Sequence, residues 1–230
     1  RGIPFGMFMH GHIFERPKGT YDRRMTWLYR KLAPHCYRQA DLLFALSREQ
    51  GELAVKAGAD RARVVITPNG LDIRDIGLIK EDVEKKIEYF HFGKVARGLY
   101  VGRLNPEKGV DVLLQACAML RDAQVDFCLD IVGSGPLEKN LRELCAELKL
   151  GDTVVKFHGS VNRKDLGKYY LGHHIQFVPS ISEPQGNVVL EGMASGCLVV
   201  ASDTGGIPDM ISHNVNGMLV QPGAPRQIFD

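Results

Sequence analysis

Short apolar runs alternate with amphipathic stretches along most of this chain. Runs of about four to eight apolar residues, bounded by glycine, proline or polar residues, are typical of buried β-strands, whereas apolar residues three or four positions apart are typical of helices. Strands are therefore predicted at 3–9, 42–47, 63–67, 97–104, 125–133, 153–159, 175–180, 198–202 and 217–220. Helices are predicted at 22–39, 48–58, 109–120, 136–148, 163–172, 187–195 and 207–212.

Three residues predict how individual helices begin, bend and end. Ser47 can cap the helix that follows it, because its side-chain oxygen can accept from a free backbone N–H group. Gly58 is placed to end the same helix. Pro34 is expected to kink or divide the helix at 22–39, since proline removes one backbone donor.

The alternation of strands and helices becomes strict from Leu99 onward. Repeated strand–helix units with apolar strands indicate a parallel, doubly wound sheet. Residues 72–95 are polar and contain no clear strand. The sequence therefore predicts an α/β protein with one domain at 1–75, a linker at 76–95 and a second domain at 96–230.

Composition and charge argue against several classes of protein. The net charge of +2 over 230 residues argues against general nucleic-acid binding. No apolar run approaches the roughly 18 residues of a membrane span, and the first residues do not resemble a secretory signal. The five cysteines lack C-x-x-C spacing, which favours reduced thiols in the cytoplasm. Because the chain opens on a strand pattern and stops at the start of a helix pattern, we expect a fragment of a longer protein.

Basic residues and glycines gather where the predicted strands end, which is where doubly wound sheets bind ligands. Arg103 leaves a strand and Lys108 begins the next helix. A planar guanidinium beside a compact ammonium suits a diphosphate. The alternative is a solvated charge pair between Lys108 and Glu107 or Asp111.

A second glycine-bearing turn contains Gly133 and Gly135. It is similar to a dinucleotide-binding pattern, but Glu138 stands where the third glycine would be. The next strand carries no acidic residue near its end to hold a ribose. This argues against an NAD site and leaves two interpretations, a tight turn near a nucleotide or a plain turn.

Two glutamates eight positions apart, Glu183 and Glu191, surround the start of a predicted helix. That helix should begin near Gly186 or Asn187, where its free N–H groups favour phosphate. A carboxylate can accept from two adjacent hydroxyls of a sugar or a ribose. The alternative gives Glu183 a capping role and Glu191 a helix salt bridge. It does not explain the EP-x-G motif before the helix and the GG-x-P motif after it.

Five ordered motifs together resemble the retaining glycosyltransferases of family 4, also called glycosyl transferases group 1. The motifs are PNGLD, GRLNPEKG, VGSGP, EPQGNVVLEGMASG and SDTGGIPDMI. The resemblance is strongest over residues 63–222. It implies the GT-B fold, with two Rossmann-like, doubly wound parallel-sheet domains and a reaction cleft between them. The N-terminal domain is expected to be incomplete here and the last helix to be missing.

The resemblance implies a hexosyltransferase that moves a sugar from a nucleoside diphosphate donor to a glycan or lipid-linked acceptor, with retention at the anomeric carbon. The donor is expected to be UDP- or GDP-linked, with no cofactor and no metal. Arg103 and Lys108 would hold the diphosphate and stabilise it as it leaves. Glu183 would contact donor-sugar hydroxyls, and Glu191 would take the ribose.

The resemblance also assigns backbone groups and one histidine. Backbone N–H groups around Gly186, Asn187 and Val188 would touch the phosphate or the sugar. The turn with Gly133 and Gly135 would lie near the base. His10, with His12 as the alternative, would face the donor sugar, although either could equally be structural.

The chain departs from the family pattern at several points. Gln185 stands where an aromatic or apolar residue is usual, and Asp209 replaces the commoner glutamate. The early strands, the glycine loop and the C-terminal helix of the family are expected to lie outside this sequence, so we do not expect this chain alone to form a complete site. Two alternatives to a transferase are a nucleotide-sugar epimerase and a nucleotide-sugar-binding protein without turnover.

The helix at 22–39 combines basic residues with Trp27 and Tyr29. A basic amphipathic helix can rest on anionic lipid. The simpler interpretation, which we favour, is a helix packed on its sheet with a solvated basic face. The expected location is therefore the cytoplasm, with peripheral contact at the inner face of the membrane as an option.

Overall fold

The computed structural model describes residues 5–9, 20–88 and 95–230. The chain divides into two compact units, residues 1–69 and residues 70–230. Each unit contains its own sheet, and every strand pair within both sheets is parallel. The predicted α/β class with parallel sheets is therefore confirmed.

The first unit has a three-stranded sheet in the order β1-β2-β3. Its strands are β1 (Gly6–Met9), β2 (Leu42–Ala45) and β3 (Val64–Ile66). Its helices are α1 (Thr20–Gln39) and α2 (Arg48–Lys56), followed by the 3₁₀ turn η1 (Arg61–Arg63). A small core of buried residues joins these elements through Met9, Ala33, Tyr37, Leu43, Ala45, Ala54 and Ala59.

The local predictions for this unit have mixed outcomes. Ser47 caps α2 as predicted, because its hydroxyl oxygen accepts from the backbone N–H of Gln50 at 3.3 Å. Gly58 follows the helix end with a φ of 108°. Pro34 does not divide the first helix, since α1 continues to Gln39.

The second unit has a six-stranded sheet in the order β6-β5-β4-β7-β8-β9. The strands are β4 (Ala96–Val101), β5 (Phe127–Val132), β6 (Val155–Gly159), β7 (Ile175–Val178), β8 (Leu198–Ser202) and β9 (Met218–Val220). Numbered within the unit, this is the order 3-2-1-4-5-6 of nucleotide-binding Rossmann sheets. The direction of winding reverses between β4 and β7, which pair with each other at the centre.

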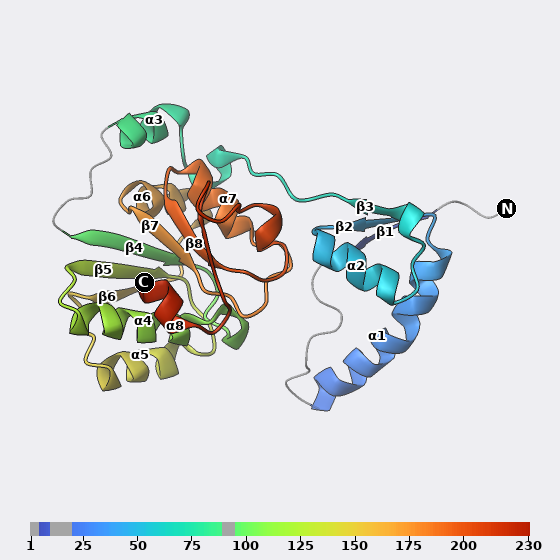
Figure 1. The fold of residues 1–230 in the computed structure, drawn as a ribbon, viewed down its shortest axis with the longest axis horizontal. Helices are drawn as coiled ribbons and strands as arrows, with labels where there is room; N and C mark the ends of the chain where they lie inside the picture. The colour runs from blue at the N-terminus through green and yellow to red at the C-terminus, as the bar shows by residue number, and fades with distance from the viewer. Residues whose placement is uncertain (1–4, 10–19, 89–94) are drawn as a thin grey trace. The chain divides into compact units, whose positions relative to one another are not determined.

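Helices cover both faces of the second sheet (Figure 1). One face is covered by α4 (Val110–Asp122), α5 (Glu138–Glu147) and α8 (Pro225–Phe229), and the other by α6 (Leu166–Leu171) and α7 (Asn187–Ala194). Successive residues of β4 explain the two layers, because side chains alternate along a strand. Tyr100 joins the core under α4 and α5, whereas Leu99 and Val101 join the core that contains Leu166 of α6.

The segment expected to be a linker begins inside the second unit. Residues 70–88 belong to that unit and include the 3₁₀ turn η2 (Ile73–Ile76) and the helix α3 (Lys80–Glu88). Ile76, Leu78 and Val83 are buried in the core below α6. The sequence pattern did not predict that this segment packs into the second unit, because α3 is mostly polar and Val83 is its one buried residue.

Lys86 ties α3 to the ends of two other helices. Its ammonium donates to the carbonyl oxygens of Tyr170 at 2.8 Å and Ser195 at 3.0 Å, and lies 3.1 Å from the Cys197 sulfur. These carbonyls lie at the C-terminal ends of α6 and α7, where a cation is favoured by the helix dipole. The contacts are half-buried, so water competes for them less than at a free surface.

Replacing Lys86 by methionine should loosen α3 without unfolding the sheet. Charge-assisted hydrogen bonds of this kind contribute about 1.5–3 kcal/mol. The backbone amides of α3 should then exchange with solvent roughly ten- to a hundredfold faster. Hydrogen exchange measured by mass spectrometry checks this, with the exposed neighbour Lys85→Met as the matched control. Equal exchange in the two variants would contradict the anchoring role of Lys86.

The helices that the structure describes include no candidate membrane span. None of them, α1 at 20 residues included, combines the length and the apolar character needed to cross a bilayer.

Candidate functional site

The candidate site lies where the winding of the second sheet reverses. The loop after β4 (residues 102–109) and the loop after β7 (residues 179–186) both leave the carboxyl ends of adjacent central strands. Open doubly wound sheets bind ligands at such switch points. Arg103, Lys108, Glu183 and the start of α7 are all carried by these two loops or follow them directly.

Arg103 is exposed just beyond the end of β4, and its side chain makes no ion pair with any residue that the structure describes. Its backbone is held in place, because the hydroxyl of buried Tyr100 donates to the Arg103 carbonyl oxygen at 2.8 Å. Burial, reinforced by the nearby Glu183 and Glu107 carboxylates, raises the pKa of Tyr100. The hydroxyl therefore stays protonated and fixes the base of the arginine, leaving the guanidinium free to meet an anion.

Lys108 and Glu183 form an ion pair across the two loops. The Lys108 ammonium lies 2.6 Å from Oε2 of Glu183, and the two side chains are only 17% and 10% exposed. The Ser180 hydroxyl lies 3.4 Å from the same oxygen. The sequence predicted separate contacts of Lys108 and Glu183 with a ligand, but did not predict that they contact each other. The solvated pairing of Lys108 with Glu107 or Asp111 is not what the structure shows.

The backbone of Glu183 is held by the glycine pair after β8. The N–H of Gly206 donates to the Glu183 carbonyl oxygen at 3.1 Å. Gly205 has a φ of 61°, and a Cβ at this position would lie 1.6 Å from that carbonyl oxygen. Only glycine permits this approach of one backbone to another. The GG-x-P motif therefore supports the loop that carries the first glutamate.

The helix α7 begins directly after Gly186, which has a φ of 83°. This agrees with the predicted start near Gly186 or Asn187. Asn187 and Val188 occupy the first turn, and Asn187 is exposed. Because a helix start carries partial positive charge, this turn can favour an anion next to Glu183 and Lys108.

Glu191 lies on the second turn of α7 and is only 2% exposed. Its Oε2 accepts from the Tyr170 hydroxyl at 2.8 Å, and its Oε1 lies 3.0 Å from the guanidinium of Arg163. The Ser195 hydroxyl donates to its backbone carbonyl oxygen at 2.6 Å. The alternative interpretation gave Glu191 a salt bridge within its helix; a salt bridge exists, but its partner Arg163 lies in the 3₁₀ turn η4 (Arg163–Asp165), not in the same helix.

Gly133 and Gly135 lie against the loop that carries Arg103. Gly133 has a φ of 140°, and a Cβ there would lie 1.8 Å from the Gly102 carbonyl oxygen. A Cβ on Gly135 would lie 2.5 Å from the Leu104 carbonyl oxygen. Close backbone packing is therefore a sufficient reason for both glycines, and their place beside a base stays a prediction.

Other predicted groups are not placed by the structure. His10 and His12 lie outside the described residues. Within 5–9, 20–88 and 95–230, no group of three or more histidine, cysteine, aspartate or glutamate side chains could hold a metal ion.

The sequence did not point to Arg163, Tyr170 or the supporting role of Gly205. Tyr170 and Glu191 lie 21 positions apart, and Lys108 and Glu183 lie 75 apart. No spacing rule connects positions in different strand–helix units. The apolar residues before Glu191 predicted its helix, but only the packing of α6 beside α7 reveals its partners.

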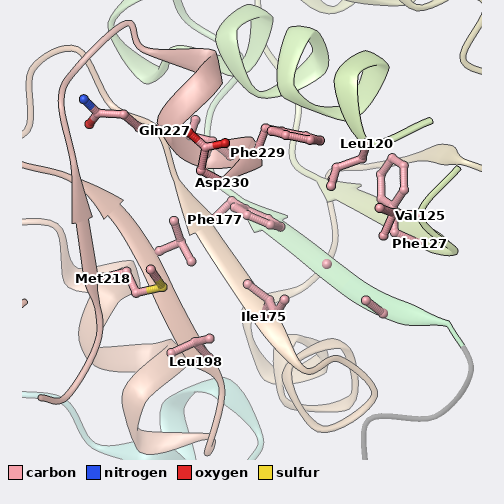
Figure 2. Close-up of a pocket in the computed structure, with 14 residues that line it drawn as sticks. Leu120, Val125, Phe127, Ile175, Phe177, Leu198, Met218, Gln227, Phe229 and Asp230 are labelled. Atoms are coloured by element: carbon pink, nitrogen blue, oxygen red, sulfur yellow. The ribbon is translucent and has the colours of Figure 1, made fainter. Parts of the chain in front are cut away.

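An apolar cavity of about 250 Å³ opens on the α4 face of the sheet, over the first residues of its strands (Figure 2). The cavity is lined by Ile175, Leu198 and Met218, the first residues of β7, β8 and β9, together with Phe177 and Phe229. No candidate site residue that the structure describes is part of this lining. The cavity is therefore separate from the switch-point site.

Family models match both units of the chain. Residues 83–230 match the family described as Glycosyl transferases group 1, and residues 1–70 match a glycosyl transferase 4-like domain.

Two relatives illustrate the similarity in sequence. An uncharacterized glycosyltransferase of Methanocaldococcus jannaschii is 40% identical over 130 residues, which are 56% of this chain and 33% of the relative. A D-inositol 3-phosphate glycosyltransferase of Pseudarthrobacter chlorophenolicus is 34% identical over 190 residues, which are 79% of this chain and 44% of the relative. The chain thus spans less than half the length of either relative.

Solved structures show the same fold. Anabaena HepE, solved with UDP and glucose and also with UDP-glucose, superposes with a TM-score of 0.75 at 25% identity, covering 98% of this chain and 60% of HepE. TarM of S. aureus superposes with a TM-score of 0.76 at 17% identity, covering 98% of this chain and 42% of TarM, and supports the fold alone.

The group 1 model spans more than half of the chain, and the sheet order, the ordered motifs and the structural neighbours agree with it. The chain therefore belongs to the group 1 glycosyltransferases, family 4, whose fold is GT-B.

Proposed function

We propose that the protein containing this chain transfers a hexose-type sugar from a nucleoside diphosphate donor to a glycan or lipid-linked acceptor. Retention at the anomeric carbon is part of the proposal and rests on the family. The supporting observation is the convergence at one switch point of Arg103, the Lys108–Glu183 pair, the start of α7 and Glu191. A diphosphate linked to two polyol rings offers a complementary set of charges and hydroxyls.

The Lys108–Glu183 pair can serve both ends of such a donor. An ammonium has three N–H donors, and Glu183 takes one of them. Two N–H donors remain for phosphate oxygens. Because Glu183 already holds the Lys108 ammonium in position, that ammonium would not have to be ordered when the diphosphate binds. Of the two carboxylate oxygens of Glu183, Oε2 is the one that contacts polar groups of the described residues. Oε1 is therefore left for the hydroxyls of the donor sugar.

The other residues take the roles that the family implies. Glu191 would hold the ribose, and the first turn of α7 at Gly186, Asn187 and Val188 would face the phosphate or sugar. Gly133 and Gly135 would lie near the base, and His10 would face the donor sugar. No cofactor or metal is part of the proposal.

The donor base is proposed to be uracil or guanine. HepE, which is 25% identical to this chain, was solved with UDP and with UDP-glucose, and this favours UDP. The proposed location is the cytoplasm. Contact with lipid through α1 is the less favoured option, although Trp27 on this helix is 58% exposed and the Lys31 ammonium lies 4.3 Å from the centre of its ring.

Calorimetric titration of the full-length protein with UDP, GDP and ADP tests the donor site. We expect UDP or GDP to bind with a clear preference over ADP. At a hundredfold excess over the dissociation constant, the bound nucleotide should stabilise the protein by about 2.7 kcal/mol. A folded protein that binds none of the three would contradict the proposal. Sugar product formed without an acceptor would instead favour an epimerase, and binding without transfer would favour a protein without turnover.

A further inference from the structure

A buried polar network lies beneath α7, on the side away from solvent. Tyr170 has 0% of its surface exposed, and its hydroxyl lies 2.8 Å from Oε2 of Glu191. The amide nitrogen of Gln176, also 0% exposed, lies 3.5 Å from the Tyr170 oxygen and donates to the Val188 carbonyl oxygen at 2.9 Å. The network therefore links the second glutamate to the backbone of the first turn of the same helix.

The direction of the hydrogen bonds in this network follows from chemistry. An amide nitrogen can only donate, so the Tyr170 oxygen accepts from Gln176 and its own proton is directed to Glu191. Burial and the neighbouring carboxylate raise the pKa of Tyr170 well above its usual value, which keeps the hydroxyl protonated. Glu191 thus has a permanent donor on Oε2.

The two oxygens of Glu191 have partners of different mobility. Tyr170 belongs to the core cluster that includes Leu99 and Leu166, and Lys86 binds its carbonyl oxygen. Arg163, which contacts Oε1, is 56% exposed and reaches the carboxylate from the surface. Oε1 is therefore the oxygen on the solvent side, and the rigid contact on Oε2 determines where Oε1 points.

We propose that Tyr170 is a positioning residue, whose hydroxyl orients the Glu191 carboxylate to accept the ribose hydroxyls of the donor nucleotide. This inference rests on the proposed function, because it needs a nucleotide at the switch point. Tyr170 does not touch the donor. It acts through Glu191, and the hydrogen bond should contribute only when the ligand has hydroxyls for that carboxylate to hold.

The variant Tyr170→Phe tests this because it removes one oxygen atom and keeps the ring. The full-length protein is titrated with UDP and with 2′,3′-dideoxy-UDP, or with the guanine pair if GDP is the nucleotide that binds. The dissociation constant for the ribonucleotide should rise about five- to thirtyfold, and that for the dideoxynucleotide less than twofold. Sugar transfer should show a raised donor KM with kcat nearly unchanged.

Comparing two nucleotides on one protein sample separates positioning from damage to the fold, since any loss of folded protein affects both titrations equally. Tyr169→Phe is the matched control. Its ring lies against His158 and outside this network, and both nucleotides should bind to it as to the natural protein. The double variant with Glu191→Gln should show little additional loss from Tyr170→Phe.

Three results would overturn the inference: equal losses for the two nucleotides, no loss for either, or full additivity with Glu191→Gln. Failure of the proposed function is seen separately, because the natural protein would then bind neither UDP nor GDP before any substitution is made.

Discussion

Replacing Arg103 by alanine in the full-length protein is expected to lower kcat for sugar transfer about a hundred- to a thousandfold. As the bond to the sugar breaks, negative charge develops on the leaving diphosphate, and a guanidinium fixed nearby stabilises that charge. Arg103 is suited to this because Tyr100 holds its backbone while its side chain has no ion partner among the described residues. Steady-state kinetics at saturating donor measures the effect.

Two comparisons make the Arg103 result specific. Stability should change by less than about 0.5 kcal/mol, since the side chain is exposed. Arg97 is an exposed arginine near the opposite end of the same strand, β4, and Arg97→Ala should leave kcat within about twofold of the natural value. If Arg103→Ala retained nearly full turnover, leaving-group stabilisation would have to come from other residues.

Replacing Gly205 by alanine is expected to disrupt the site through the backbone of Glu183. A residue other than glycine at a φ of 61° costs about 1–2 kcal/mol by itself. In addition, the new Cβ would lie 1.6 Å from the Glu183 carbonyl oxygen, so one of the two loops must move and the hydrogen bond from Gly206 is lost. We expect a loss of about 3 kcal/mol or more in stability and at least tenfold weaker binding of the donor nucleotide.

Gly223→Ala is the matched control for Gly205→Ala. Gly223 has a φ of 77°, but a Cβ there would have no neighbour closer than the Ile181 Cδ1 atom at 3.9 Å. The Gly223→Ala variant should lose about 1–2 kcal/mol of its free energy of unfolding through backbone strain, and its affinity for the nucleotide should not change. Chemical denaturation and calorimetric titration measure both variants. If both variants lost the same stability and the same nucleotide affinity, backbone strain alone, and not contact with Glu183, would explain the effect.

The positions of the strands along the chain could be predicted because their causes are local. The strands of the second sheet are apolar runs, as expected for parallel strands buried on both faces, and β4, β5, β6 and β7 are each followed by an α-helix close to a predicted one. The helix predicted at 207–212 after β8 is wrong, because the structure has only the three-residue 3₁₀ turn η5 (Ile207–Asp209) there. Ser47 and Gly186 mark helix starts through their own chemistry, so both boundaries agreed with prediction. The motifs indicated the family and its Rossmann-like domains, whereas the strand order of the second sheet comes from the structure.

The parts that could not be predicted depend on contacts between distant segments. The polar helix α3 joins the second unit through Val83 and the ammonium of Lys86, neither of which produces a recognisable period. The Lys108–Glu183 and Tyr170–Glu191 contacts form only once separate strand–helix units lie side by side. A sequence pattern can show that a carboxylate follows a strand, but its partners come from tertiary packing.

The pairing of charges at the switch point also bears on how a donor would arrive. The Lys108–Glu183 and Arg163–Glu191 pairs and the loop after β4 together carry equal numbers of positive and negative side chains. The three positive ones are Arg103, Lys108 and Arg163, and the three negative ones are Glu107, Glu183 and Glu191. A nearly neutral site exerts little long-range attraction, and the Debye length of about 8 Å at physiological salt shortens it further. Encounter would then be governed by ordinary diffusion and depend little on ionic strength. The site would then distinguish nucleotides from other polyanions only at contact distance, where the ligand must match the fixed geometry of each ion pair.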